Sequence, residues 1–238
     1  MTRRRWIADE FNSVTAALTG DHAEHLIRVL RAQVGQEFDI ATGQTVRRGR
    51  ITSIQDRRVE FELREALPAT EALNLTLVLA IFKFDRMEWA IEKCTELGVA
   101  RIIPVVAQRT DSHLAGAALK RRERWERIAR QAAEQCRRTS PPDIAEPMKL
   151  KQVVGLPGQL RVLLNESEDK VPLNQAIRKQ SDDVLLAVGP EGGWTEAEVD
   201  CFKQAGWVSA SLGDTILRSE TAAIAAVAIV LAERSEKS

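Results

Sequence analysis

From Leu73 onward, short apolar segments alternate with longer segments whose apolar residues have helical spacing. This alternation is typical of an α/β domain built on a largely parallel sheet, and ligands of such sheets bind at loops beyond the carboxyl ends of the strands. Strands are predicted at residues 75–81, 102–106, 161–164, 184–188 and 208–212, and helices at 86–97, 118–138, 196–205 and 219–234.

Residues 1–70 have a different pattern, with short alternating segments such as 37–40 and 58–63. Gly35, Gly43 and Gly49 separate these segments, which predicts a small antiparallel β-domain or barrel. One helix is predicted between His22 and Arg31. Residues 68–71 are interpreted as a linker, so the chain is predicted to hold two domains, 1–70 and 73–238.

Charge and cysteine content restrict the partners only weakly. Lys and Arg together number 34, as do Asp and Glu, so the net charge neither indicates nor excludes a nucleic-acid partner. The three cysteines lie far apart, which indicates reduced thiols in a cytoplasmic protein. No second histidine lies at ligand spacing from His25, so no metal is predicted.

Neither end of the chain resembles a membrane or export segment. Arg3, Arg4 and Arg5 are followed by the short segment WIADE at 6–10, in which Asp9 and Glu10 interrupt the apolar stretch that a signal peptide needs. The apolar run 222–232 is about half the length that crosses a bilayer. We therefore expect a buried helix there and a cytoplasmic protein without a membrane partner.

Two strand-to-helix loops carry the functional signal. In residues 188–195, three glycines surround Pro190, which lets backbone approach a ligand closely, and Thr195 can cap the following helix. The sequence contains neither G-x-G-x-x-G nor G-x-x-x-x-G-K-[ST], so a nucleotide-phosphate site lacks its usual motif, and a tight turn stays an alternative.

The second loop, residues 211–222, is another strand-to-helix junction, and it contains Ile216 and Leu217 beyond the predicted strand 208–212. Apolar walls with free backbone amides suit a flat adenine ring. Burial of both side chains in the core is the alternative, because large aliphatic residues are usually buried.

Together the two loops carry a specific resemblance. GPEGGW at 189–194 and LGDTILRSETA at 212–222 resemble the paired cofactor loops of the RsmE family of ribosomal small-subunit methyltransferases. Further segments match in order along the chain, and they include HLIRVLR at 25–31, KFDRME at 83–88, EKCTELGV at 92–99 and AEQCRR at 133–138. The resemblance therefore covers nearly the whole chain.

The resemblance implies a fold and an activity. The expected fold is an N-terminal PUA-like β-barrel followed by an α/β SPOUT domain with a deep C-terminal trefoil knot. The expected activity is S-adenosylmethionine-dependent methylation of uridine N3 in 16S ribosomal RNA of the small subunit by a homodimer. Two alternatives stay open: a SPOUT RNA methyltransferase with another target, and a non-catalytic RNA-binding factor of ribosome assembly.

The resemblance also implies the residues of the cofactor pocket. Glu191 would face the ribose or shape the turn, and these two roles stay open. The implied pocket residues are Leu164, Gly189, Glu191, Gly192, Leu212, Gly213, Ile216 and Leu217.

Methylation of uracil N3 requires removal of a proton, so the site needs a base or a cation that stabilises the developing charge. Arg218 is the candidate cation, with a phosphate contact or a salt bridge to Glu220 as its alternative. Glu166 and Glu220 are candidate bases, although carboxylates near strand ends also cap helices or pair with arginines.

Arginines are the candidate RNA contacts, because the guanidinium group binds phosphate through two hydrogen bonds. Residues 1–70 contain arginine but no lysine. The resemblance to the family adds two arginines later in the chain, Arg109 and Arg138, to the candidates. Residues 120–127 form a second basic stretch, either a phosphate track or a solvated helix face. The candidates are Arg4, Arg28, Arg31, Arg109 and Arg138.

Three residues depart from the family pattern. Trp194 stands where phenylalanine is usual and keeps an aromatic wall. Cys136 replaces a common serine, and Asp214 places a negative charge beside the second loop.

Overall fold

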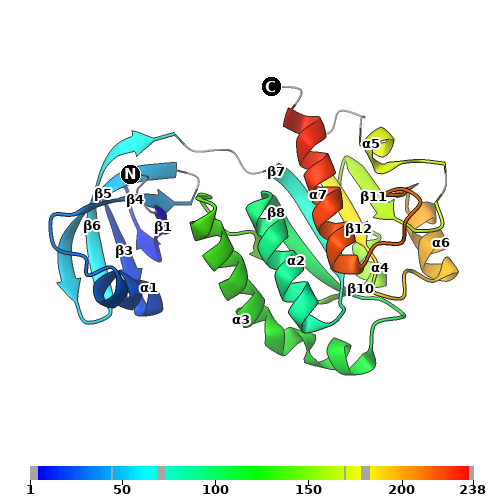
Figure 1. The fold of residues 1–238 in the computed structure, drawn as a ribbon, viewed down its shortest axis with the longest axis horizontal. Coiled ribbons are helices and arrows are strands. Elements are labelled where there is room, and N and C mark those ends of the chain that lie inside the picture. The colour runs from blue at the N-terminus through cyan, green and yellow to red at the C-terminus, as the bar shows by residue number, and fades with distance from the viewer. Residues whose placement is uncertain (1–4, 44, 69–72, 169, 178–182, 236–238) are drawn as a thin grey trace. The chain divides into compact units, whose positions relative to one another are not determined.

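A computed structural model describes residues 5–43, 45–68, 73–168, 170–177 and 183–235 of the 238-residue chain (Figure 1). Arg4 and most of the predicted linker therefore lie outside the described residues. The chain divides into two compact units, each of which consists of two separate segments of the chain. The first unit is Met1–Glu71 with Ala133–Pro141, and the second is Ala72–Ala132 with Pro142–Ser238.

The N-terminal unit is built on a six-stranded sheet of order β1-β4-β5-β6-β3-β2. Its neighbours are antiparallel except β1, which lies parallel to β4 and so departs from the purely antiparallel prediction. The described strands thus form a half-barrel with β1 and β2 at its two ends. Their bounds are β1 (Arg5–Ile7), β2 (Glu10–Phe11), β3 (Thr15–Thr19), β4 (Glu37–Thr42), β5 (Thr45–Gln55) and β6 (Arg58–Leu67).

Two local predictions for this unit need correction. Gly49 does not separate strands but lies inside β5, where a Cβ atom would approach Ile40 Cγ1 to 2.5 Å. The absence of a side chain there lets the sheet pack on itself. The predicted helix is present, but it begins as α1 (Gly20–Glu24) and continues as the π-helix η1 (His25–Val29).

The C-terminal unit contains a seven-stranded sheet in which every described pairing is parallel. The order is β10-β8-β7-β12-β11-β13, with β9 beside β8. The strands are β7 (Leu73–Ala80), β8 (Val99–Val106), β9 (Asp143–Ile144), β10 (Met148–Lys149), β11 (Leu160–Leu164), β12 (Val184–Val188) and β13 (Val208–Ala210).

The helices of this unit agree with the predicted ones to within a few residues at most ends. Sequence patterns missed β9, β10, α4 and α5, because two to four residues are too few to show a period. The helices are α2 (Phe84–Glu96), α3 (Ser112–Gln135), α4 (Leu150–Val153), α5 (Leu173–Ala176), α6 (Glu196–Gln204) and α7 (Ser219–Ser235).

Helices cover both faces of this sheet, as a parallel sheet requires. On β7, Leu75, Leu77 and Leu79 pack in the core cluster that contains the buried residues of α2 and α7. Val78 and Ala80 point to the opposite cluster, which includes side chains of α4 and α6. Figure 1 shows α2 and α7 side by side across the first of these faces.

The order of the sheet places three strand ends together. β12, β11 and β13 are neighbours and parallel, and they end at Val188, Leu164 and Ala210. The loops that follow them therefore leave the same edge of the sheet. Both loops singled out from the sequence are among them.

In the described part of the chain, no helix combines the length and the apolar character that crossing a membrane requires.

Candidate cofactor and catalytic site

A pocket lies at the shared carboxyl edge of β11, β12 and β13. It holds about 670 Å³ of empty space, part of it open to solvent. Its lining includes the apolar residues Leu164, Val188, Leu212, Ile216 and Leu217, together with Gly189, Gly193 and Gly213.

Trp194 forms an aromatic wall of the pocket. Its indole ring packs against Phe202 of α6 at a centroid distance of 5.1 Å, and Phe202 packs in turn against Trp207 at 4.9 Å. A Cβ atom at Gly189 would lie 3.1 Å from Trp194 Nε1, so a side chain at this position would press on the indole. Trp194, which stands where the family usually has phenylalanine, thus still provides an aromatic wall.

Gly193 has a left-handed backbone with a φ of 70°. This backbone conformation favours glycine, and a Cβ atom there would also approach Glu166 Oε1 to 2.6 Å, so the Glu166 carboxylate would have to move. The Gly193 amide donates a hydrogen bond to the Pro190 carbonyl at 2.9 Å, which closes the turn. Both features bring the loop 189–194 close to the loop after β11.

A capping box fixes the end of this loop at α6. The Thr195 side chain accepts a hydrogen bond from the Glu198 amide at 3.3 Å, and Glu198 Oε2 accepts one from the Thr195 amide at 2.9 Å. Glu198 is buried, and its Oε1 accepts a further hydrogen bond from the Gln108 amide at 2.7 Å. The helix cap therefore also ties the loop to the segment after β8.

Two arginines brace the same loop from other elements. The Arg109 guanidinium donates to the Gly192 carbonyl. Arg86, on α2, donates to Glu191 Oε1 at 3.1 Å, and its Nε lies 3.7 Å from Glu220 Oε1 on α7. No role for Arg86 was predicted, because its partners are more than 100 positions away in the sequence.

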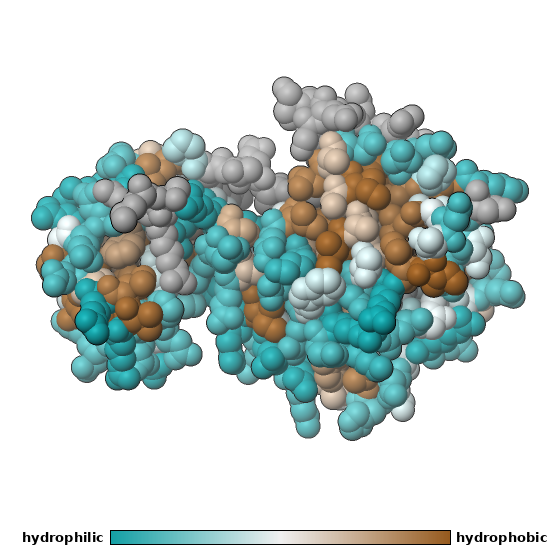
Figure 2. Space-filling view, viewed as in Figure 1, coloured by the Kyte–Doolittle hydropathy of each residue, from teal (hydrophilic) through white to brown (hydrophobic). Residues whose placement is uncertain are grey.

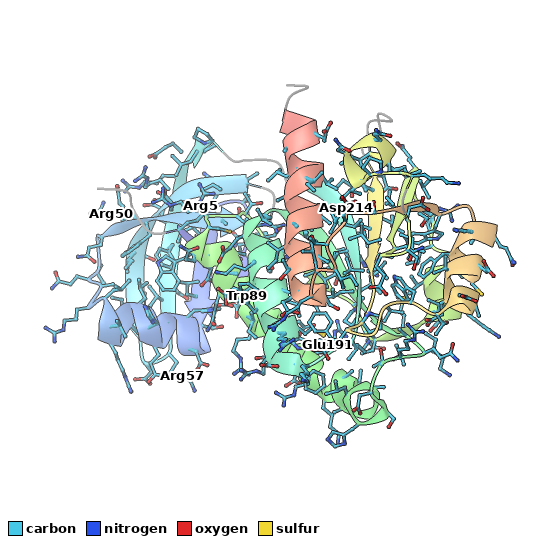
Figure 3. The ribbon with its side chains drawn as sticks, turned by 45° about the vertical axis from the view of Figure 1, so that its right-hand side comes forward. Arg5, Arg50, Arg57, Trp89, Glu191 and Asp214 are labelled. Carbon is cyan, nitrogen blue, oxygen red and sulfur yellow. The ribbon has the colours of Figure 1, made fainter. Side chains whose placement is uncertain are left out.

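The structure brings together most of the predicted cofactor residues. Leu164, Gly189, Leu212, Gly213, Ile216 and Leu217 line the pocket. Glu191 and Gly192 belong to the same loop as Gly189 but are outside the lining, and they accept hydrogen bonds from Arg86 and Arg109, respectively. Figure 3 shows Glu191 near the first turn of α7.

The three predicted catalytic residues lie in different surroundings. Glu166 is exposed and lines the pocket. Arg218 is exposed and lies outside the lining, between the lining residues Leu217 and Ser219. Glu220 is 4% exposed, and its carboxylate lies beside Arg86 rather than in the pocket.

The charged residues of the pocket lining are both acidic. They are Glu166 and Asp214, and Asp214 is one of the departures from the family pattern. Figure 3 places Asp214 on the loop that leads toward α7. Two carboxylates at one pocket favour a ligand with a positively charged centre.

The predicted RNA-binding arginines of the N-terminal unit have different local surroundings. Arg28 forms an ion pair of 2.6 Å with Glu24, whereas Arg31 is exposed and has a φ of 51°. Burial lowers the pKa of the Arg138 guanidinium below its usual value. Arg4 lies outside the described residues.

Ion pairs neutralise part of the predicted phosphate track at residues 120–127. Arg124 donates two hydrogen bonds to Glu88, at 2.6 and 2.8 Å. The Arg121 guanidinium lies 4.8 Å from the centre of the Phe84 ring. Most of this stretch is nevertheless exposed or half-buried.

Within the described ranges, no group of three or more His, Cys, Asp or Glu side chains could hold a metal ion.

Comparison with known families agrees with this architecture. A family model described as an RNA methyltransferase domain matches residues 69–231, more than half of the chain. A second, described as an RNA methyltransferase PUA domain, matches residues 18–64. The fold and the pocket therefore belong to the class of RNA methyltransferases that carry a PUA domain.

The curated relatives narrow this class. Ribosomal RNA small subunit methyltransferase E of Synechocystis is 33% identical over 226 residues, which cover 92% of this chain and 74% of that protein. The chain belongs to the ribosomal RNA small subunit methyltransferase E family, and the predicted resemblance is confirmed.

Solved structures agree in fold over the full length. The ribosomal RNA small subunit methyltransferase E of Neisseria gonorrhoeae, bound to S-adenosylmethionine, has a TM-score of 0.85 and 29% identity, with 95% of this chain and 96% of that chain covered. A Legionella pneumophila protein with bound S-adenosylmethionine has a TM-score of 0.85 and 28% identity, with 98% of each chain covered.

Proposed function

We propose that this protein transfers a methyl group from S-adenosylmethionine to N3 of one uridine in 16S ribosomal RNA of the small subunit. The observation that carries the proposal is the pocket shared by loops 189–194 and 212–217 in a chain of this family. The target nitrogen lies on the pairing edge of the base, so the uridine must be unpaired or flipped out.

The residues of the pocket fit this cofactor. Its apolar walls, together with the backbone groups of the two loops, suit an adenine ring. Glu166 and Asp214 complement the positive sulfonium and ammonium groups. When bound, the cofactor supplies an activated methyl group, and the protein holds donor and acceptor in line.

The pocket residues have separate tasks in this proposal. Glu191 and Gly192 keep the loop 189–194 in place. The residues that hold the cofactor are Leu164, Gly189, Leu212, Gly213, Ile216 and Leu217. Glu166 accepts the N3 proton, because it is the predicted catalytic carboxylate that lines the pocket. Arg218 stabilises negative charge that develops on a uracil oxygen. Glu220 is buried beside Arg86, which favours a supporting role over that of a base.

RNA binding is assigned mainly to the N-terminal unit, in accord with its match to a PUA domain. Arg28 and Arg31 are exposed and available to phosphate, and Arg4 precedes the described residues. Arg138 belongs to the segment 133–141 that groups with this unit, so the RNA-binding domain comprises residues 1–70 together with that segment. One guanidinium nitrogen of Arg109 donates to the Gly192 carbonyl, and the other nitrogens contact RNA in this proposal.

We also propose that the protein is a cytoplasmic homodimer with a trefoil knot in the SPOUT domain. Side chains of α7 that are not fully buried include Ile224, Ile229 and Leu231, and Trp89 of α2 is 48% exposed. Figure 2 shows apolar side chains gathered over α7 and the loop that precedes it. Such a surface suits a partner subunit.

The test is transfer of labelled methyl from S-adenosylmethionine to small ribosomal subunits from cells that lack this gene. We expect label at one uridine, located by a stop in reverse transcription. Label in a ribose or a guanine would indicate another SPOUT target. Absence of label together with absence of cofactor binding would indicate a non-catalytic RNA-binding factor.

Two variants locate the chemistry in the pocket. Glu166→Gln keeps the shape of the side chain but removes the base, so we expect kcat at saturating S-adenosylmethionine to fall about 100-fold or more. Cofactor binding should weaken much less, because Asp214 still complements the positive groups of the cofactor. Glu168→Gln is the matched control, because Glu168 lies two positions away and outside the lining. Equal activity of both variants would contradict the role of Glu166.

A further inference from the structure

We infer that Arg86 is a positioning residue that joins the loop 189–194 to the end of the second cofactor loop, where α7 begins, and so sets the spacing between two walls of the pocket. The inference rests on the proposed function, since it concerns the same pocket. Arg86 is not among the lining residues, so it acts through its two carboxylate partners.

The geometry connects the two loops through one guanidinium group. Arg86 Nη1 lies 3.1 Å from Glu191 Oε1, and Arg86 Nε lies 3.7 Å from Glu220 Oε1. Glu191 immediately follows the lining residue Pro190, and Glu220 immediately follows the lining residue Ser219. A displacement of either carboxylate therefore moves a wall of the pocket.

Burial makes the pair with Glu220 more than a surface contact. The Glu220 side chain is 6% exposed, and its Oε2 has no hydrogen-bond partner in the described structure. A buried carboxylate is unfavourable unless a positive group compensates it. Arg86 provides this compensation, and the amino-terminal end of α7 adds the favourable end of a helix dipole.

Local helix stability does not account for Arg86. The residue lies in the first turn of α2, where a positive charge opposes the helix dipole. Its ion-pair partners Glu191 and Glu220 belong to the loop after β12 and to α7. The favourable electrostatic energy of Arg86 therefore comes from tertiary contacts.

A fixed spacing between the walls matters for binding and for chemistry. Loops held in place before the ligand arrives lose less conformational entropy on binding. Methyl transfer further requires donor and acceptor to be aligned, so a small displacement of the loops slows the reaction. Loss of Arg86 is thus expected to weaken cofactor affinity and also to lower kcat.

The first comparison measures binding of S-adenosylmethionine by calorimetry. We expect Arg86→Met to weaken the affinity about tenfold, and Arg86→Lys to lie between this variant and wild type. The control is Arg124→Met, which removes an exposed bidentate pair with Glu88 near the same helix. Its affinity should stay within about twofold of wild type.

The second comparison separates positioning from folding. In Arg86→Met the buried Glu220 carboxylate is left without its partner, so the thermal midpoint should fall. The double variant Arg86→Met with Glu220→Gln removes that charge and should recover the midpoint, whereas affinity and kcat should stay low because the loops remain unjoined.

Wild-type affinity in Arg86→Met would overturn the inference, as would recovery of both affinity and kcat in the double variant. Failure of the wild-type protein to bind S-adenosylmethionine would instead overturn the proposed function, and with it this inference. The affinity of the wild-type protein for S-adenosylmethionine therefore distinguishes failure of the proposed function from failure of the inference on Arg86.

Discussion

At the scale of single residues, Gly193 and Glu166 both line the pocket, and an added Cβ atom at Gly193 would lie 2.6 Å from Glu166 Oε1. Gly193→Ala forces a side chain onto a φ of 70° and onto the Glu166 carboxylate. We expect a loss of about 1–3 kcal/mol in the free energy of unfolding. Affinity for S-adenosylmethionine should fall in the same variant. Denaturant titration and calorimetry measure the two effects.

Gly116→Ala provides the control for that substitution. Gly116 lies in α3, and a Cβ atom there would meet nothing within 4 Å. Alanine is the better helix former, so this variant should gain about 0.5–1 kcal/mol in stability. A Gly193→Ala protein as stable and as tightly bound to cofactor as wild type would contradict the steric account.

The cysteines provide a second prediction at this scale. Burial raises the pKa of the Cys94 thiol to about 12, so near neutral pH it is protonated, whereas the thiolate is the reactive form. Cys201 is exposed. We expect iodoacetamide to label Cys201 in the native protein and Cys94 only after unfolding, as measured by peptide mass spectrometry. Equal native labelling of both residues would contradict the burial of Cys94.

At the scale of elements, the capping box of α6 links a helix start to the cofactor loop. Thr195→Ala removes the side chain that accepts from the Glu198 amide, which should lower stability by about 1 kcal/mol. Because Thr195 follows the loop 189–194 directly, cofactor affinity should weaken too. Thermal unfolding and calorimetry test both effects.

Glu196→Gln is the matched control for the capping box, because Glu196 lies in the same first turn and is exposed. It should change stability by only a few tenths of a kcal/mol, about the effect of one charge at a helix end. If both variants lost the same stability, the cap would not be the cause.

At the scale of the whole molecule, the proposed homodimer can be tested at the exposed part of α7. Ile224→Glu places a charge on a half-buried apolar position of this helix. Because a charge is unfavourable in an apolar interface, we expect light scattering to give the monomer mass. Thr221→Glu, at an exposed position of the same helix, should keep the dimer mass. A monomeric wild-type protein would contradict the proposal.

The sequence by itself determined the class of fold and the location of the site. Strands such as β12 are continuous apolar runs and α6 has a clear amphipathic period, so these elements were predicted to within a residue or two. The paired loops also carried the family resemblance. Six of the eight implied cofactor residues line the observed pocket, because their place after parallel strands puts them at one edge.

Only the tertiary structure decided how these loops are held. The parallel pairing of β1 with β4, the grouping of residues 133–141 with the N-terminal unit and the contacts of Arg86 all join distant segments. Local patterns report the periodicity of one segment and the face that it buries. They carry no information about which distant side chain compensates a buried charge such as that of Glu220, because this depends on the packing of the whole unit.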